Sequence, residues 1–312
     1  MVLPRPSPML LTRLCLAALL ANMGIVLTGA LVRLTSSGLG CPTWPKCTDS
    51  SYVNTTEYGV HGRIEFTNRT LTFVLSAVVV ACIVAALMQR PRRRDLVALC
   101  WALFAGIVGQ AVLGGITVRT HLNPWTVAAH FLLSMVLVAT AATLVFRAHD
   151  GTPPIGAAGP RPVRWLALSV TAVTAVVLGL GTVVTASGPH AGDASAARTG
   201  FDLATVSHVH AGAVMVLVAL TITALVSLRV TRAATRLQRA AGVLLGLELA
   251  QGAVGYVQYF TGVPVVLVAV HVGGACLVWL AAVWLALLVR RGGAEPSAAH
   301  PLTLPAEATS TA

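Results

Sequence analysis

Eight long apolar segments dominate this sequence and restrict what it can fold into. They cover about residues 12–33, 65–89, 95–118, 123–146, 164–186, 205–228, 237–260 and 263–289. Each is long enough to cross the roughly 30 Å hydrocarbon core of a bilayer as an α-helix. Only 10% of the residues are charged, whereas soluble proteins have roughly 25%. The sequence therefore predicts an all-α polytopic membrane protein with eight transmembrane helices.

The first apolar segment follows Arg5 and Arg13, an arrangement that also occurs in secretory signal peptides. Its apolar stretch is longer than the central region of a typical signal peptide, and an internal repeat pairs it with the fifth segment. We therefore expect it to be retained as a helix.

The net charge of +11 is concentrated in alternate connections between the segments. This is the positive-inside pattern of membrane proteins, so the charge does not indicate a nucleic-acid partner. The pattern predicts cytoplasmic N and C termini in a multi-pass protein of the plasma membrane. The connections expected outside are about 34–62, 119–122, 187–204 and 260–263.

The chain contains one four-helix unit twice. Gln110 and His130 of the first half recur as Gln251 and His271, with 20 residues between Gln and His in both halves and an offset of 141. The ends of the first and fifth segments, TGALVRLTSSG and GLGTVVTASG, are also similar. Because four helices separate equivalent positions, the halves have the same orientation in the membrane. We expect two parallel-repeat four-helix bundles.

The repeat also divides the chain into parts. We expect an N-terminal four-helix half over 1–147 and a C-terminal four-helix half over 164–291. The connection 148–163 is rich in Gly and Pro, as expected of a cytoplasmic linker. The tail 292–312 has the composition of a disordered cytoplasmic segment.

Polar residues within a membrane segment are costly, and they are therefore functional candidates. His210 and His271 lie in the sixth and eighth segments, which both enter from the external side, so their imidazoles lie at similar depth. Two His on separate helices, with Gly neighbours, can bind a haem iron from both faces. The alternative is interhelical hydrogen bonding. His208 lies about 200° around the helix from His210 and cannot face the same site.

The first half has diverged from the second. His130 is the counterpart of His271, but Asn68 stands where His210 would be expected. Glu65 has a serine at the equivalent position of the second half. A catalytic pocket beside a cofactor pocket would explain this difference, whereas a symmetric structural role would not require it.

Four polar residues at the start of the second segment have spacings of 4, 3 and 4 and share one helical face: His61, Glu65, Asn68 and Thr72. Glu65 is the candidate catalytic residue of this face. The alternative is a structural carboxylate, favoured by the helix dipole or paired with Arg63 or Arg69.

Cys41 and Cys47 lie in the first external connection, within GCPTWPKC. Outside the cytoplasm such a pair can persist as a disulfide. Metal binding is less favoured, because no further Cys or His nearby completes a tetrahedral set. We expect a disulfide, either structural or redox-active.

These features together resemble the haem A synthase family. They are a TG-x-x-VR-x-T-x-SG end of the first helix, a two-Cys external loop, IEFTNR at the start of the second helix, and His on helices four, six and eight. The resemblance covers about residues 12–290. It implies an oxidoreductase that converts the C8 methyl of haem O to the formyl of haem A for terminal oxidase assembly.

The resemblance also implies roles for individual residues. His210 and His271 would be the axial ligands of a permanent haem b, and His130 would face the iron of the substrate, haem O. Glu65 matches the essential glutamate of the family, and Cys41 with Cys47 matches its loop pair. Iron is then expected only as haem iron.

The chain departs from the family in one motif. The usual Glu-x-x-His-Arg reads Glu65-x-x-Asn68-Arg69 here, so one expected ligand of the substrate haem is absent. Either His130 is the single protein ligand, or His61 substitutes from about 10 Å away along the helix. We expect His130 alone, with Asn68 lining the pocket and His61 and Arg69 as weaker candidates.

The resemblance further implies the partners and the side of the membrane. The partners are haem O, the haem O synthase that supplies it, membrane lipid and an unidentified electron acceptor. A homo-oligomer is left open. The Cys41–Cys47 loop and both haem sites would lie toward the extracytoplasmic side. The residues also allow another function, a non-catalytic bis-His membrane b-type cytochrome that relays electrons, which leaves Glu65 without a purpose.

Overall fold

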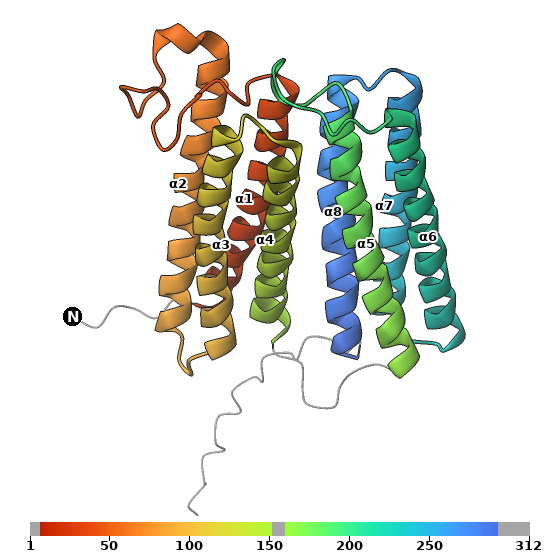
Figure 1. Ribbon diagram of the computed structural model, residues 1–312. Helices are drawn as coiled ribbons and strands as arrows, with labels where there is room; N and C mark the ends of the chain where they lie inside the picture. Colours follow the sequence, from red (N-terminus) through yellow and green to blue (C-terminus); the bar gives the residue numbers. More distant parts are fainter. Residues whose placement is uncertain (1–6, 152–159, 293–312) are drawn as a thin grey trace, which may run out of the picture.

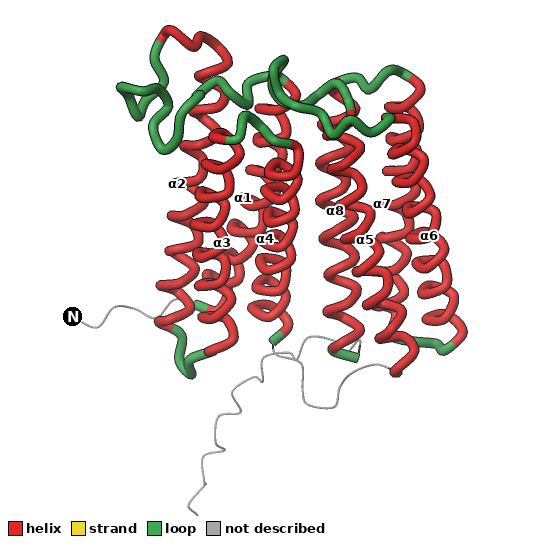
Figure 2. The backbone as a smooth tube through the Cα atoms, viewed as in Figure 1, coloured by secondary structure: helices red, strands yellow, loops and turns green. Residues whose placement is uncertain are grey.

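The computed structural model describes residues 7–151 and 160–292, which form eight long α-helices, one short 3-10 helix and no strand (Figures 1 and 2). The elements are α1 (Pro8–Leu34), η1 (Thr56–Tyr58), α2 (Gly59–Met88), α3 (Arg94–Arg119), α4 (Pro124–Asp150), α5 (Arg161–Ser187), α6 (Leu203–Val230), α7 (Thr235–Phe260) and α8 (Val265–Arg290). All eight α-helices are long and apolar enough to cross a membrane. The prediction of an all-α multi-pass membrane protein is confirmed.

The helices extend beyond the apolar segments that predicted them. Polar caps explain part of the extension: Ser7 and Asp202 accept hydrogen bonds from the first turns of α1 and α6, and Asn123 does the same for α4. Apolar composition reports only the part of a helix inside hydrocarbon, so it misses such ends. At α2 the difference matters, because the helix begins at Gly59 and includes His61 in its first turn.

The same effect shortens the expected linker. Residues 148–150 belong to α4 and residues 161–163 to α5. The remainder of the expected linker, 152–159, and the expected tail from residue 293 onward lie outside the described residues.

Each half of the chain packs as a closed ring of helices. In the first half α1 contacts α2 and α4, and α3 contacts α2 and α4; α5 to α8 repeat this arrangement (Figure 1). The halves meet through α1, α4, α5 and α8. The α1–α2, α3–α4, α5–α6 and α7–α8 connections lie at one end, at the top of Figure 1. The even-numbered helices therefore all start from that end.

Two contacts join the halves within the helices. The indole Nε1 of Trp279 on α8 donates a hydrogen bond to the carbonyl of Met135 on α4, at 2.8 Å. Gly273 on α8 lets α1 approach closely, because a methyl group added there would lie 3.1 Å from Cδ2 of Leu27. Small residues at helix contacts are typical of membrane bundles, where backbones can then pack tightly.

Polar groups join the halves at both ends. At the connected end, Arg33 donates to the carbonyls of His190 (2.6 Å) and Thr185 (3.0 Å) in the second half. At the opposite end, the fully buried carboxylate of Asp150 accepts from Arg236 at 2.6 Å. Polar contacts thus join the halves at both ends of the helices as well as within them.

Candidate functional site

Four polar side chains lie at similar depth in the even-numbered helices: Asn68 on α2, His130 on α4, His210 on α6 and His271 on α8. Each lies between six and nine residues after the start of its helix. At 1.5 Å per residue this is about 9–14 Å from the connected end. The sequence prediction that His210 and His271 lie at similar depth is therefore consistent with the helix boundaries, and Asn68 and His130 lie at this level as well.

Each of these side chains faces a glycine on the preceding helix. A methyl group added at Gly114, Gly181 or Gly255 would lie 3.2, 3.4 or 3.5 Å from the imidazole Cε1 of its histidine. The pairs are Gly114 with His130, Gly181 with His210, Gly255 with His271 and, at 3.9 Å to the amide nitrogen, Gly29 with Asn68. The glycines let these side chains lie directly against the backbone of the neighbouring helix. The same kind of glycine contact occurs in both halves.

The polar atoms of this level are not satisfied by the protein. Nδ1 of His130, His210 and His271 and the amide oxygen of Asn68 are buried without a hydrogen-bond partner among the described residues. Buried polar atoms are normally paired, so such a group needs an explanation, and a bound ligand is one. Imidazoles with an unpartnered Nδ1, packed against glycines of the neighbouring helix, fit ligands of a flat macrocycle, which needs only one or two protein ligands.

A metal site built from protein side chains alone is a different matter. Among residues 7–151 and 160–292, no three His, Cys, Asp or Glu side chains come together as ligands of one ion. Haem iron, which brings most of its own ligands, does not require such a group.

His208 lies apart from this level of histidines. Its side chain is exposed, and its ring lies 6.3 Å from that of Tyr259 on α7. The structure thus separates it from His210, as the helical period predicts.

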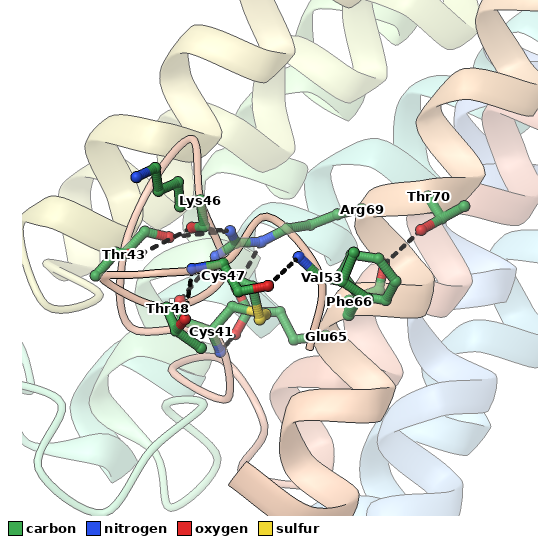
Figure 3. Close-up of a disulfide and its surroundings, with 11 residues drawn as sticks. Cys41, Thr43, Lys46, Cys47, Thr48, Val53, Glu65, Phe66, Arg69 and Thr70 are labelled. Atoms are coloured by element: carbon green, nitrogen blue, oxygen red, sulfur yellow. Dashed lines mark hydrogen bonds and ion pairs between the residues drawn. A yellow bond between two sulfur atoms is a disulfide. The ribbon is translucent and has the colours of Figure 1, made fainter. Parts of the chain in front are cut away.

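Glu65 lies where α2 meets the loop between α1 and α2 (Figure 3). The carboxylate is buried, with 6% of the residue exposed. Its Oε2 accepts from the backbone N–H of Cys41 at 2.7 Å, and its Oε1 accepts from Nε and Nη2 of Arg69 at 3.1 and 2.5 Å. Both oxygens are therefore engaged by the loop and by Arg69. The ion pair with Arg69 that the sequence allowed is present, whereas Arg63 is exposed.

Arg69 connects the loop to α2. Besides Glu65, its guanidinium donates to the carbonyls of Cys41 (2.8 Å), Thr43 (3.0 Å) and Lys46 (3.3 Å). These carbonyls belong to the segment closed by the Cys41–Cys47 disulfide, which the structure contains as the sequence predicted (Figure 3). Arg69 thus donates both to the loop and to Glu65, and it holds the carboxylate at the junction of the loop and α2.

His61 lies at the outer end of α2 and is exposed. Its Nδ1 is 2.9 Å from the hydroxyl of Ser37, at the end of α1. Hydrogen bonds from the Ser195 hydroxyl and N–H lower the pKa of Asp193 in the facing loop, and the nearby His61 adds to this effect. These contacts hold His61 among the loops, two turns of helix above Asn68.

The glycine contacts were not among the predictions from the sequence. Gly114 and Gly255 each lie 16 residues before a histidine. That constant spacing is the signal that could have paired them with His130 and His271, since it crosses one short turn between antiparallel helices. Gly29 and Gly181 carry no comparable signal, because long loops separate them from their partners.

Comparison with known proteins assigns the family. The family model described as cytochrome oxidase assembly protein (COX15-CtaA) matches residues 12–283. The chain belongs to this family. The resemblance seen in the sequence is thereby confirmed at the level of the family.

Curated relatives support the same family and carry the name heme A synthase. The protein of Lysinibacillus sphaericus is 28% identical over 172 residues, which cover 54% of this chain and 55% of the relative. That of Listeria monocytogenes (strain HCC23) is 31% identical over 121 residues, 38% of this chain and 39% of the relative. That of Alkalihalophilus pseudofirmus is 29% identical over 142 residues, 44% and 47%. The chain thus spans about half the length, or less, of the curated relatives it matches.

Proposed function

We propose that this protein is a haem A synthase, which oxidises the C8 methyl of haem O to a formyl group and so supplies haem A for terminal oxidase assembly. The difference between its halves carries the proposal. The second half has two glycine-backed histidines, whereas the first has one, an asparagine and, three residues before that asparagine, a buried glutamate. The names of the relatives support the same reaction.

In this proposal the two halves divide the work. Residues 164–291 form the haem b half, in which His210 and His271 would hold the haem, and the haem would act there as a one-electron carrier. Residues 1–147 form the substrate half, in which His130 faces the iron of haem O. Asn68 offers an amide on the opposite wall, so the substrate iron has one firm protein ligand.

The surroundings follow from the positive-inside pattern and from the reaction. The termini lie in the cytoplasm, and the Cys41–Cys47 loop and both haem sites lie toward the extracytoplasmic side of the plasma membrane. A haem O synthase delivers the substrate, and an acceptor not identified by these residues takes the electrons. The only iron in the protein is haem iron.

Glu65 has a chemical task that its position allows. When water supplies the oxygen, conversion of a methyl to a formyl group releases four electrons and four protons in two successive oxidations. A carboxylate at the pocket entrance can accept protons from the attacking water or stabilise developing positive charge. Both oxygens of Glu65 are hydrogen-bonded, so it must exchange the Cys41 N–H or Arg69 for substrate or water during the reaction.

Haem extraction tests this function. Membranes from cells that express the protein with a haem O source should contain haem A, identified by chromatography and mass. Glu65→Gln should retain bound haem and lower haem A at least tenfold, because the amide cannot accept a proton. The matched control is Glu57→Gln, a change at an exposed glutamate of η1, which should leave haem A at the parental level.

Two results would contradict the proposal. A Glu65→Gln protein that makes haem A at the parental rate removes Glu65 from the chemistry. A wild-type protein that yields only haem B is instead the bis-His b-type cytochrome that relays electrons.

A further inference from the structure

A second buried carboxyl group lies deep in the second half, and the proposed function does not use it. Glu248, in the middle of α7, is 2% exposed. Its Oε1 accepts a hydrogen bond from the hydroxyl of Thr221 on α6 at 2.8 Å, and Thr221 is itself fully buried. Its Oε2 is buried without a hydrogen-bond partner. Glu248 is also the only Asp or Glu in the sequences of α5 to α8.

No basic side chain of the neighbouring helices pairs with Glu248. Helix α7 packs against α6 and α8. On α6, His210 and Arg229 lie about 16 and 12 Å along the axis from Thr221, and on α7 itself Arg239 lies about 14 Å from Glu248. The other titratable or basic groups of the three helices are His208, Arg232 after α6, Arg236, Tyr256, Tyr259, His271, Cys276 and Arg290. Cys276 belongs to the core cluster that α8 shares with the first half.

An isolated carboxylate in the centre of a membrane bundle is costly, whereas a protonated carboxyl group can donate from one oxygen and accept at the other. Thr221 already donates to Oε1, so the unpartnered Oε2 is the oxygen that would hold the proton.

The position of Glu248 links it to the level of the histidines. Glu248, Gln251 and Gly255 follow a spacing of three and four residues and share one face of α7. Gly255 backs His271, and Gln251 fills the space beside Gly274 on α8, where any added side chain would overlap it. Glu248 thus lies about 10 Å along the axis below the glycine that backs His271.

The first half provides an internal comparison. The same face of α3 carries Ile107, Gln110 and Gly114 at the equivalent positions. Ile107 is buried and apolar, so the first half has no carboxyl group at this depth. The acid is therefore specific to the half with two glycine-backed histidines, and it is not required by the repeat itself.

We infer that Glu248 is a proton-binding residue coupled to the redox state of the second half. One proton binds at Oε2 when an electron arrives on the iron held by His210 and His271, and it leaves when that electron passes to the acceptor. The electron comes from oxidation of the haem O methyl, and the proton comes from water. The inference rests on the proposed function, because it requires haem b in this half.

The physical cause is the charge of the iron. The oxidised iron carries one more positive charge than the reduced iron, and this charge stabilises a nearby carboxylate. For charges about 10 Å apart at an effective dielectric constant of about 20, the effect on proton affinity is roughly tenfold. Reduction removes the stabilisation, and the carboxylate takes up a proton.

The test is a potentiometric titration of purified haem-loaded protein at a series of pH values. The visible spectrum of the second-half haem is the readout of its redox state. The midpoint potential of the wild type should fall as pH rises, and that of Glu248→Gln should be independent of pH. Glu57→Gln, a change at an exposed glutamate, is the matched control and should behave as the wild type. The reduced-minus-oxidised infrared spectrum should show a carboxylic acid C=O band that Glu248→Gln lacks.

Thr221→Val keeps the acid and removes its hydrogen-bond donor, so it serves if Glu248→Gln does not fold. It should keep the pH dependence and move the C=O band to higher frequency. The inference is overturned if the C=O band does not move in Thr221→Val or is missing from the wild type. It is also overturned if Glu248→Gln keeps the pH dependence of the midpoint potential. Protein that makes haem A but has a pH-independent potential rejects the inference alone. Protein that binds haem b with the expected pH dependence but makes no haem A rejects the proposed function alone.

Discussion

Glycines at helix contacts determine where the imidazole rings of this protein can lie. Each of the three histidines has its Cε1 within 3.2 to 3.5 Å of the place a Cβ would take on the neighbouring helix. The contact is closest at Gly114, where alanine would force His130 to shift by a few tenths of an ångström. If these histidines bind haem iron as proposed, ligation would require a defined ring position, and the glycines would act on the ligands without touching the iron.

Gly114→Ala should weaken binding of the substrate haem severalfold and lower haem A production, because the added methyl displaces His130. The haem b spectrum of the second half should not change. Gly109→Ala is the matched control on the same helix, since its methyl would lie at an ordinary 3.7 Å from Leu133. Haem binding by titration and haem A by extraction give the readout. Equal effects of the two substitutions would show that the contact with His130 is unimportant.

The candidate ligands were predictable from the sequence, because a histidine inside an apolar segment stands out by composition alone. The hydrogen bonds of Glu65 to the loop were not predictable. Its principal loop partner is the backbone N–H of Cys41, and a backbone donor leaves no trace in the identity of the residue. Glu248 is recognisable in the sequence as the only acidic residue in the last four apolar segments. The first half has no acidic residue at the equivalent position, so the repeat does not point to it.

At the level of elements, the start of α2 and the disulfide loop form one unit. Arg69 and Glu65 on α2 bind the carbonyls and an N–H of the loop, and the disulfide closes the segment that carries them. The helix count was predictable from apolar length. The start of α2 at Gly59 was not, because polar residues occupy its first turns and apolar composition cannot report them.

Arg69→Gln should loosen this unit, because it leaves Glu65 without its cationic partner and three loop carbonyls without a donor. The expected loss is about 2–3 kcal/mol of unfolding free energy, the usual cost of unsatisfied buried groups. Limited proteolysis within residues 42–53 should become faster. Arg63→Gln, at an exposed arginine of the same helix, is the control and should change neither quantity. A loop equally resistant in both variants would mean that the disulfide alone holds it.

At the level of the whole molecule, the proposed function requires two similar halves to stay together so that electrons can pass between them. The duplication was predictable from the equal Gln-to-His spacing and from the similar helix ends. Which faces of the halves join was not, since large apolar side chains are both buried and exposed along α1, α4, α5 and α8. Small residues and single polar contacts determine which faces join, and these contacts can be identified only once the helices are packed.

Trp279 provides the test of this interface. Its indole, 9% exposed, carries the hydrogen bond from α8 to the carbonyl of Met135 on α4, so Trp279→Phe removes one interhalf bond and some packing volume. The expected loss is about 1–2 kcal/mol of unfolding free energy, measured by denaturant titration in detergent. Trp165→Phe, at a tryptophan of α5 that is 62% exposed, is the matched control and should stay within about 0.5 kcal/mol of wild type.

Electron transfer from substrate to haem b should also slow in Trp279→Phe, because the halves then hold their relative position less rigidly. Equal stability of the two variants would mean that the polar clamps at Arg33 and Asp150 hold the halves together, and that the contact of α8 with α4 contributes little.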